Sequence, residues 1–119
     1  MSASLGTPTA WTDVAGAFDI MGDVINGFAV TVDVRTKTRY AGHTVQPRII
    51  RCNLDSTHSF DAQVALGSAE SETAAEGHWQ RLTFTATGGT GKFYRLQILV
   101  SNAQGVGYAL GIGMAVPPA

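Results

Sequence analysis

The chain has 119 residues, with nine acidic and eight basic side chains and a formal net charge of −1. One domain of this size buries a core without disulfides or metals, and the single cysteine excludes an internal disulfide. Eight dispersed basic residues are too few for a nucleic-acid surface, and no apolar run is long enough to span a membrane. Charged residues make up only 14% of the chain, a composition that favours association.

Residues 1–12 are mostly small or polar, with Leu5 and Trp11 as their apolar anchors. We therefore expect an N-terminal arm over residues 1–12, followed by one domain over residues 13–119. The N-terminus lacks the basic region and apolar core of a secretory signal. We accordingly expect the chain to be made in a host cytoplasm.

Alternating apolar and polar residues predict β-strands from residue 27 onwards. The predicted strands span residues 27–35, 44–54, 60–66, 79–87, 92–102 and 106–116. Residues 67–77 are interpreted as a loop, and the glycine-rich residues 88–91 as a hairpin connection. The fold class predicted from this order is all-β, a single antiparallel jelly-roll β-sandwich.

The last predicted strand, Val106 to Val116, has large apolar residues on one face and only small residues on the other. The small residues are Gly107, Ala109, Gly111, Gly113 and Ala115. Glycine weakens a strand unless another backbone comes close to it. We interpret Gly107, Ala109, Gly111 and Gly113 as part of an interface, together with Trp11.

Charge is distributed unevenly along the chain. The first third contains Asp13, Asp19, Asp23 and Asp33, whereas the residues after Glu76 include Arg81, Lys92 and Arg95 but no acidic side chain. These charges either pair within the chain or contact solvent. The alternative is head-to-tail matching between copies.

Basic residues also recur from residue 35 onwards. Arg35, Lys37 and Arg39 share a face if their strand continues that far, and Arg48 and Arg51 extend the set. Arginine suits carboxylates at protein interfaces, so Arg35, Lys37 and Arg39 are candidate interface residues. The alternative is a solvated edge that discourages aggregation.

No pattern indicates catalysis, and we predict no enzyme, no metal and no cofactor. His43, His58 and His78 lack the spacing of metal ligands. No nucleophile elbow surrounds Ser56 in a Ser56, His58 and Asp61 arrangement. Turn formation explains Asp55, Ser56 and Thr57 better. Cys52, in an apolar run, is interpreted as a buried inert thiol.

The segment His78–Ala86, followed after a glycine-bearing turn by Tyr94–Ile98, resembles the signature of jelly-roll carbohydrate-binding-like modules of the galactose-binding-domain type. Phe28–Lys37 resembles their early core strand. The resemblance implies that Trp79 either caps the core or is a candidate sugar platform. These modules commonly carry an acidic pair in the last strand near a structural calcium, and residues 108–113 here lack such oxygen ligands.

Two functions remain open. The first is a virion structural protein, a small capsid decoration or cement protein of a tailed bacteriophage. It would bind the major capsid protein and copies of itself at the capsid surface, because a single bare module with its own start methionine and no export signal is typical of virion proteins. The alternative is a carbohydrate-binding module of a phage tail or host-surface adhesin, with a surface glycan as its ligand. Neither function involves nucleic acid or a membrane.

Overall fold

A computed structural model describes residues 2–4, 11–14, 19–36, 44–70, 78–89, 91–100, 107–109 and 112–115. Its strands are β1 (Ser2–Ser4), β2 (Thr12–Asp13), β3 (Asp19–Met21), β4 (Ala29–Thr36), β5 (Val45–Asn53), β6 (Phe60–Leu66), β7 (His78–Thr85), β8 (Lys92–Val100), β9 (Gly107–Ala109) and β10 (Ile112–Ala115). A four-residue helix, α1 (Gly22–Ile25), follows β3. The protein is an all-β antiparallel jelly-roll sandwich, as predicted.

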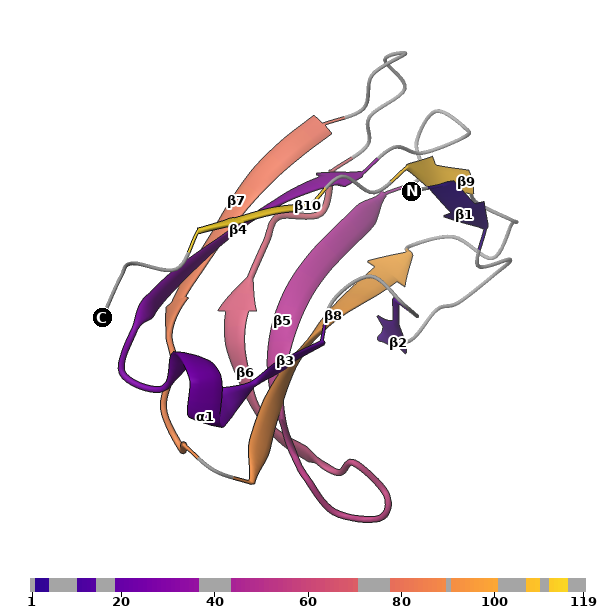
Figure 1. Cartoon of the computed structure of the whole chain (residues 1–119). Coiled ribbons are helices and arrows are strands. Elements are labelled where there is room, and N and C mark those ends of the chain that lie inside the picture. Colours follow the sequence, from indigo (N-terminus) through magenta and orange to yellow (C-terminus); the bar gives the residue numbers. More distant parts are fainter. Residues whose placement is uncertain are drawn as a thin grey trace.

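The strands form two main layers and a small additional pair (Figure 1). One layer is a three-stranded sheet in the order β10-β4-β7. The other is a five-stranded sheet in the order β2-β8-β5-β6, in which β3 also pairs with β8. β2 and β3 pair with different parts of β8, while β1 pairs with β9. The short β1–β9 pair is separate from the two main sheets.

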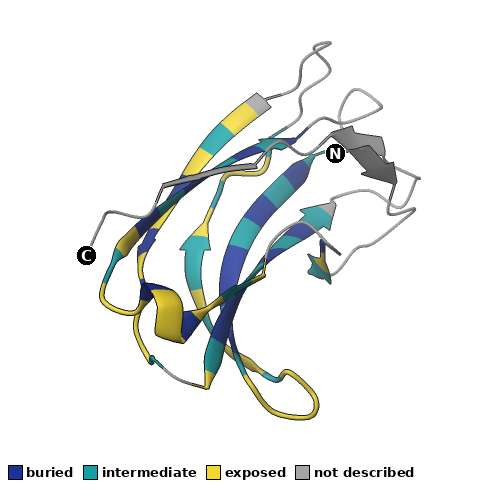
Figure 2. Ribbon diagram, in the orientation of Figure 1, coloured by how far each residue is buried: buried dark blue, intermediate teal, exposed yellow. Residues whose placement is uncertain are grey.

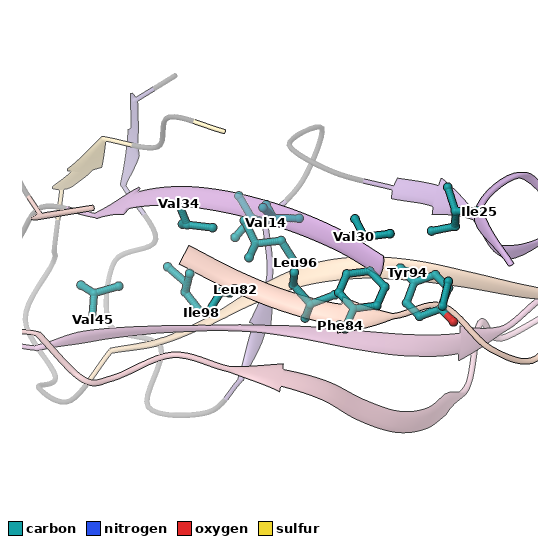
Figure 3. Close-up of a cluster of buried hydrophobic side chains, with 13 residues drawn as sticks. Val14, Ile25, Val30, Val34, Val45, Leu82, Phe84, Tyr94, Leu96 and Ile98 are labelled. Atoms are coloured by element: carbon teal, nitrogen blue, oxygen red, sulfur yellow. The ribbon is translucent and has the colours of Figure 1, made fainter. Parts of the chain in front are cut away.

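The core lies between the two main sheets and follows the predicted alternation (Figure 3). β4 contributes Val30, Val32 and Val34, all with no exposed surface. Phe84 of β7 stacks on Tyr94 of β8 with ring centroids 4.8 Å apart, so this contact joins the sheets. The buried Tyr94 hydroxyl donates to the Thr87 carbonyl at 2.7 Å and accepts from the Thr87 amide at 2.9 Å. Its polar atom is thereby satisfied.

The glycine-rich residues 88–91 do not form the predicted hairpin. β7 belongs to the three-stranded sheet and β8 to the five-stranded sheet, so this connection crosses between the layers. Gly88, Gly89 and Gly91 have φ angles of 93°, 54° and 81°. The turn needs glycine, as predicted. Its glycines, however, carry the chain from one sheet to the other and do not join two neighbouring strands.

The predicted final strand is also divided. β9 pairs with β1, whereas β10 pairs with β4. Gly111 lies outside the described residues. A single continuous strand over 106–116 is therefore wrong, because its two described parts belong to different sheets.

Strand β6 departs from the simple alternation predicted for it. The register between β5 and β6 shifts twice, between Ile49 and Ile50 and between Arg51 and Cys52. Phe60 and Leu66 consequently have 56% and 52% of their surface exposed, while Val64 packs against the core. Bulges of this kind change which face a side chain occupies.

The segment before residue 27 holds elements that periodicity does not predict, namely β2, β3 and α1. They are too short to show a period. Figure 2 shows exposed residues on α1 and on the loop after β5, whereas β5 itself alternates between buried and half-buried residues. Within the described part of the chain, no helix has the length and apolar character needed to cross a membrane.

Candidate functional site

The candidate site is the outer face of the five-stranded sheet, which we call the five-stranded face. Strand register places its residues in three rows that run across the sheet. The first row is Leu66, Arg48, Gln97 and Asp13; the second is Gln63, Ile50, Arg95 and Asp19; the third is Phe60, Cys52, Phe93 and Met21. The first two rows are mainly polar and the third is apolar.

Arg95 organises one side of this face. Its Nε donates to Asp19 Oδ1 at 3.0 Å and its Nη1 to Asp13 Oδ2 at 2.8 Å. Gln97 Nε2 also donates to Asp13, at 2.8 Å. The hydrogen bond to Asp19 is the main cause that raises the pKa of Arg95. The acidic first third and the basic last third are thus matched within one chain.

Arg48 lies between aromatic rings at the centre of the face. Its guanidinium carbon is 4.2 Å from the ring centroid of Trp11 and 5.6 Å from that of Phe60. Its Nε donates to Gln97 Oε1 at 2.9 Å and its Nη1 to Gln63 Oε1 at 3.1 Å. These contacts hold the arginine and both amides in fixed orientations. Trp11, predicted at an interface, is half-buried here.

Three apolar residues of the second and third rows are buried and form a small second core on this face. Ile50, Cys52 and Phe93 are buried and form a cluster separate from the main core. Cys52 is therefore the buried thiol that its sequence context predicts, and burial raises the pKa of the thiol. Apolar residues therefore lie beside polar ones on the same face, and a ligand with both polar and apolar parts needs both kinds of contact.

A cavity of about 160 Å³ opens at one end of the apolar row. It is lined by Asp19, Met21, Leu54, His58, Phe93 and Arg95. The His58 ring meets Phe93 edge to face, with centroids 5.2 Å apart. The cavity wall is therefore built from β3, β8 and the loop after β5.

Asp55 fixes the loop that carries His58. Its carboxylate accepts hydrogen bonds from the Thr57 amide at 3.1 Å, the Ser59 amide at 3.0 Å and the Ser59 hydroxyl at 2.5 Å. The hydroxyl of Ser59 is the main cause that lowers the pKa of Asp55 to about 2. Within this loop His58 has a φ of 52°, a left-handed conformation that is uncommon for residues other than glycine and that histidine adopts more often than most.

The opposite face, on the three-stranded sheet, carries several of the predicted interface residues. Trp79 has 53% of its surface exposed, so the interpretation that it caps the core is wrong. The period of two that directs Leu82 inward directs Trp79 outward. Trp79 is paired with Arg35, whose guanidinium carbon is 5.6 Å from the Trp79 ring centroid. Trp79 remains a candidate platform.

The predicted basic cluster is not brought together. Arg35 lies on the three-stranded sheet, Arg48 on the five-stranded face, and Arg51 pairs with Asp61 at 2.6 Å. That pairing also occupies the carboxylate considered for a Ser56–His58–Asp61 arrangement. Lys37 and Arg39 lie outside the described residues. The described members are separated because β4 and β5 belong to different sheets.

The predicted glycine and alanine surface is represented by short strands. Gly107 and Ala109 belong to β9, opposite Ser4 and Ser2. Gly113 belongs to β10, opposite Asp33 of β4. Gly113 therefore lies at the same register level as the ion pair of Asp33 and Arg81, in which Nε and Oδ1 are 2.8 Å apart.

Metal chemistry has no support in the described ranges, where no group of three or more histidine, cysteine, aspartate or glutamate side chains could hold an ion. The polar groups of the five-stranded face are arginines, side-chain amides and carboxylates paired with arginine. Such a face can bind a ligand by hydrogen bonds and apolar contact.

Comparisons with solved structures identify other proteins with the same jelly-roll fold. The chain is similar to the CBM22-1 xylan-binding domain of Paenibacillus barcinonensis Xyn10C, with a TM-score of 0.55 and 14% identity, over 100% of this chain and 94% of that one. It is also similar to the CBM22-1-GH10 modules of Clostridium thermocellum Xyn10B complexed with xylohexaose, with a TM-score of 0.50 and 15% identity, over 98% of this chain and 26% of that one.

A viral structure shares the same fold. A chain in the structure of infectious bursal disease virus, Gx strain, matches with a TM-score of 0.57 and 13% identity, over 98% of this chain and 28% of that one. No protein-family model and no curated protein sequence matches the chain. The chain therefore has a jelly-roll fold of the kind found in carbohydrate-binding modules and in a viral protein. Identities this low show the fold alone.

Proposed function

We propose that the protein is a non-catalytic binding module that recognises a carbohydrate chain on the five-stranded face. The observation that carries this proposal is the arrangement of aromatic rings beside two rows of oriented amide and guanidinium groups. A sugar ring has apolar C–H faces and a polar hydroxyl edge, so it needs both kinds of group side by side. The resemblance of the fold to xylan-binding domains supports the same proposal.

The polar groups of this face are held ready for a ligand. Arg48 and Gln97 bond to each other and to neighbouring side chains, so little side-chain freedom is lost when they also contact a hydroxyl. Preorganisation of this kind raises affinity without new contacts. Phe60, with 56% of its surface exposed, supplies an accessible ring next to them.

A glycan array that includes xylohexaose tests this proposal. Phe60→Ala should lower the affinity for any glycan bound by the wild type by about tenfold or more, because one ring stacked on an aromatic side chain contributes roughly 1–3 kcal/mol. Trp79→Ala is the matched control, since it removes a similarly exposed ring from the opposite face. Loss of binding in Trp79→Ala alone would instead make Trp79 the sugar platform.

The second candidate is a capsid decoration or cement protein of a tailed bacteriophage, and a different face supports it. Trp79 and Arg35 lie together on the three-stranded sheet, where β10 with the small residue Gly113 is the other neighbour of β4. The Nε atom of Arg35 is buried and has no hydrogen-bond partner among the described residues. A carboxylate on the major capsid protein, or on another copy of this chain, would pair with the guanidinium group of Arg35.

In this second function the protein is made in the host cytoplasm and assembles on the capsid surface as an oligomer, with residues 1–12 as an attachment arm for the domain of residues 13–119. Co-sedimentation with purified capsids tests it. Arg35→Glu should abolish co-sedimentation, and Phe60→Ala should leave it unchanged. The two functions use opposite sheets, so these two variants separate them.

A further inference from the structure

The cavity beside the apolar row has the size of a small ring. Its volume of about 160 Å³ is close to that of an apolar cavity of about 150 Å³ known to hold benzene. It is open to solvent at the end of the row formed by Phe60, Cys52, Phe93 and Met21. A group projecting from a ligand on the five-stranded face can enter it.

The walls of the cavity favour an uncharged apolar group. Met21 and Leu54 have 42% and 48% of their surface exposed, and Phe93 forms the buried floor. The two charged groups, Asp19 and Arg95, bond to each other at 3.0 Å and 3.3 Å, and Arg95 also bonds to Asp13, so their polar atoms already have partners. A hydroxyl group in this cavity would lose hydrogen bonds to water and find few protein groups to replace them. A methyl group makes no hydrogen bonds and would lose none.

The neighbouring row places hydrogen-bonding groups within reach of the same ligand. Arg95 belongs to both the polar second row and the cavity wall. Gln63 lies in that second row as well, on β6. A sugar whose hydroxyls contact the polar rows would therefore direct a substituent of the same ring towards Met21, Leu54 and Phe93.

We propose that this cavity selects sugar residues bearing a methyl group, as in a 6-deoxy sugar or an O-acetylated sugar. The inference rests on the proposed carbohydrate binding and names the class of sugar. The wall is formed in advance, because Asp55 holds the loop and His58 keeps a left-handed backbone conformation. Backbone strain retained in a ligand-facing loop is typical of preorganised sites.

Pairs of sugars that differ only at the methyl group provide the test. L-fucose is compared with L-galactose, L-rhamnose with L-mannose, and acetylated with deacetylated xylo-oligosaccharide, each as an immobilised glycoside. At least one methyl-bearing member should bind about tenfold more tightly than its partner, which is the discrimination expected for one apolar group in a pocket. Equal affinity within every pair that binds would overturn the inference.

A variant that fills the cavity adds a second readout. Leu54→Trp should remove the preference within the pair, whereas Val24→Trp, at a residue with 69% of its surface exposed and no place in the cavity lining, should keep it. Met21→Trp, which also enlarges a residue of the cavity lining, replaces Leu54→Trp if the latter does not fold. A preference that survives the filled cavity would contradict the inference but leave carbohydrate binding intact. Binding of no glycan at all would overturn carbohydrate binding itself and the inference with it.

Discussion

At the scale of single residues, the carboxylate of Asp55 does more for local order than its exposed position suggests. It accepts hydrogen bonds from two backbone amides and two hydroxyls within the next four residues. An aspartate that accepts bonds from the following backbone forms a turn without help from a sheet. This side chain, together with the backbone hydrogen bond from the Asn53 amide to the Ser59 carbonyl, holds the loop that forms one wall of the cavity.

Asp55 also makes stability depend on pH in a predictable range. Its pKa falls from 3.8 to about 2 on folding, so the folded state binds this proton less readily than the unfolded chain. The stabilisation is therefore fully present above about pH 4 and is lost as pH falls towards 2. Asp55→Ala should lower the melting temperature at pH 7, and the difference from wild type should shrink at pH 2. An unchanged difference across that range would contradict this role.

A second residue-scale prediction contrasts two phenylalanines. Phe84 is 5% exposed and stacks on Tyr94 between the sheets. Phe84→Ala should lower the free energy of unfolding by about 3–5 kcal/mol. Phe60→Ala should cost less than about 1 kcal/mol, because Phe60 is largely in solvent. Urea denaturation measures both, and equal losses would contradict the assigned faces.

At the scale of elements, the glycine-rich connection between β7 and β8 decides how the sheets are joined. Gly91 has a φ of 81°, and a Cβ atom added there would meet nothing within 4 Å, so its constraint is conformational and not steric. Gly91→Ala should lower the free energy of unfolding by roughly 1–2 kcal/mol, and Gly91→Asn by less, because asparagine tolerates this region. Thermal denaturation of both variants checks the order. A neutral Gly91→Ala would contradict it.

Alternation predicted most strands because each has one face in a continuous core. It predicts one core shared by Leu82, Phe84, Leu96, Ile98, Leu110 and Ile112. The first four are buried in the core, whereas the side chains of the last two are outside the described part of the chain. Alternation does not show that β7 and β8 lie in different sheets, because a glycine-rich turn can form a hairpin within one sheet or cross between two sheets. The strands β2 and β3 were missed because two or three residues carry no period, although β8 pairs with both.

The candidate site was less accessible to sequence reasoning than the core. Trp11 was selected, but Arg48 was grouped with Arg35 and Arg51, which lie elsewhere. The cavity joins residues near positions 20, 55 and 94, and no spacing along the chain relates three such segments. Trp79 is interpreted from the sequence mainly as a core residue, although the alternation that directs Leu82 inward directs Trp79 outward, where it is exposed.

At the scale of the whole molecule, ion pairs join segments that are far apart in the sequence. Arg95 binds Asp13 and Asp19, and Arg81 binds Asp33. The uneven charge of the sequence is thus used for intramolecular matching, and the alternative of head-to-tail matching between copies is not needed to explain it. Hydrogen bonds from Arg81 hold the pKa of Asp33 below its usual value.

This matching can be tested through Arg95. Arg95→Met should lower the free energy of unfolding by roughly 1–2 kcal/mol, because a partly screened guanidinium with two carboxylate partners is lost. The loss should be smaller at 1 M salt than at 0.05 M. Sedimentation should show the same association state for both proteins. A change in that state without a change in stability would indicate that Arg95 acts between copies.

The order of strands in the two sheets has a consequence for synthesis on the ribosome. β2 and β3 are made long before β8, their described partner, which ends at Val100. β4 likewise waits for β7 and β10. Among the described strands, only β5 and β6 can pair soon after they emerge. The sandwich therefore closes when almost all of the chain has left the ribosome. A protein with such long-range pairing folds slowly and depends on protection of its earlier strands until then.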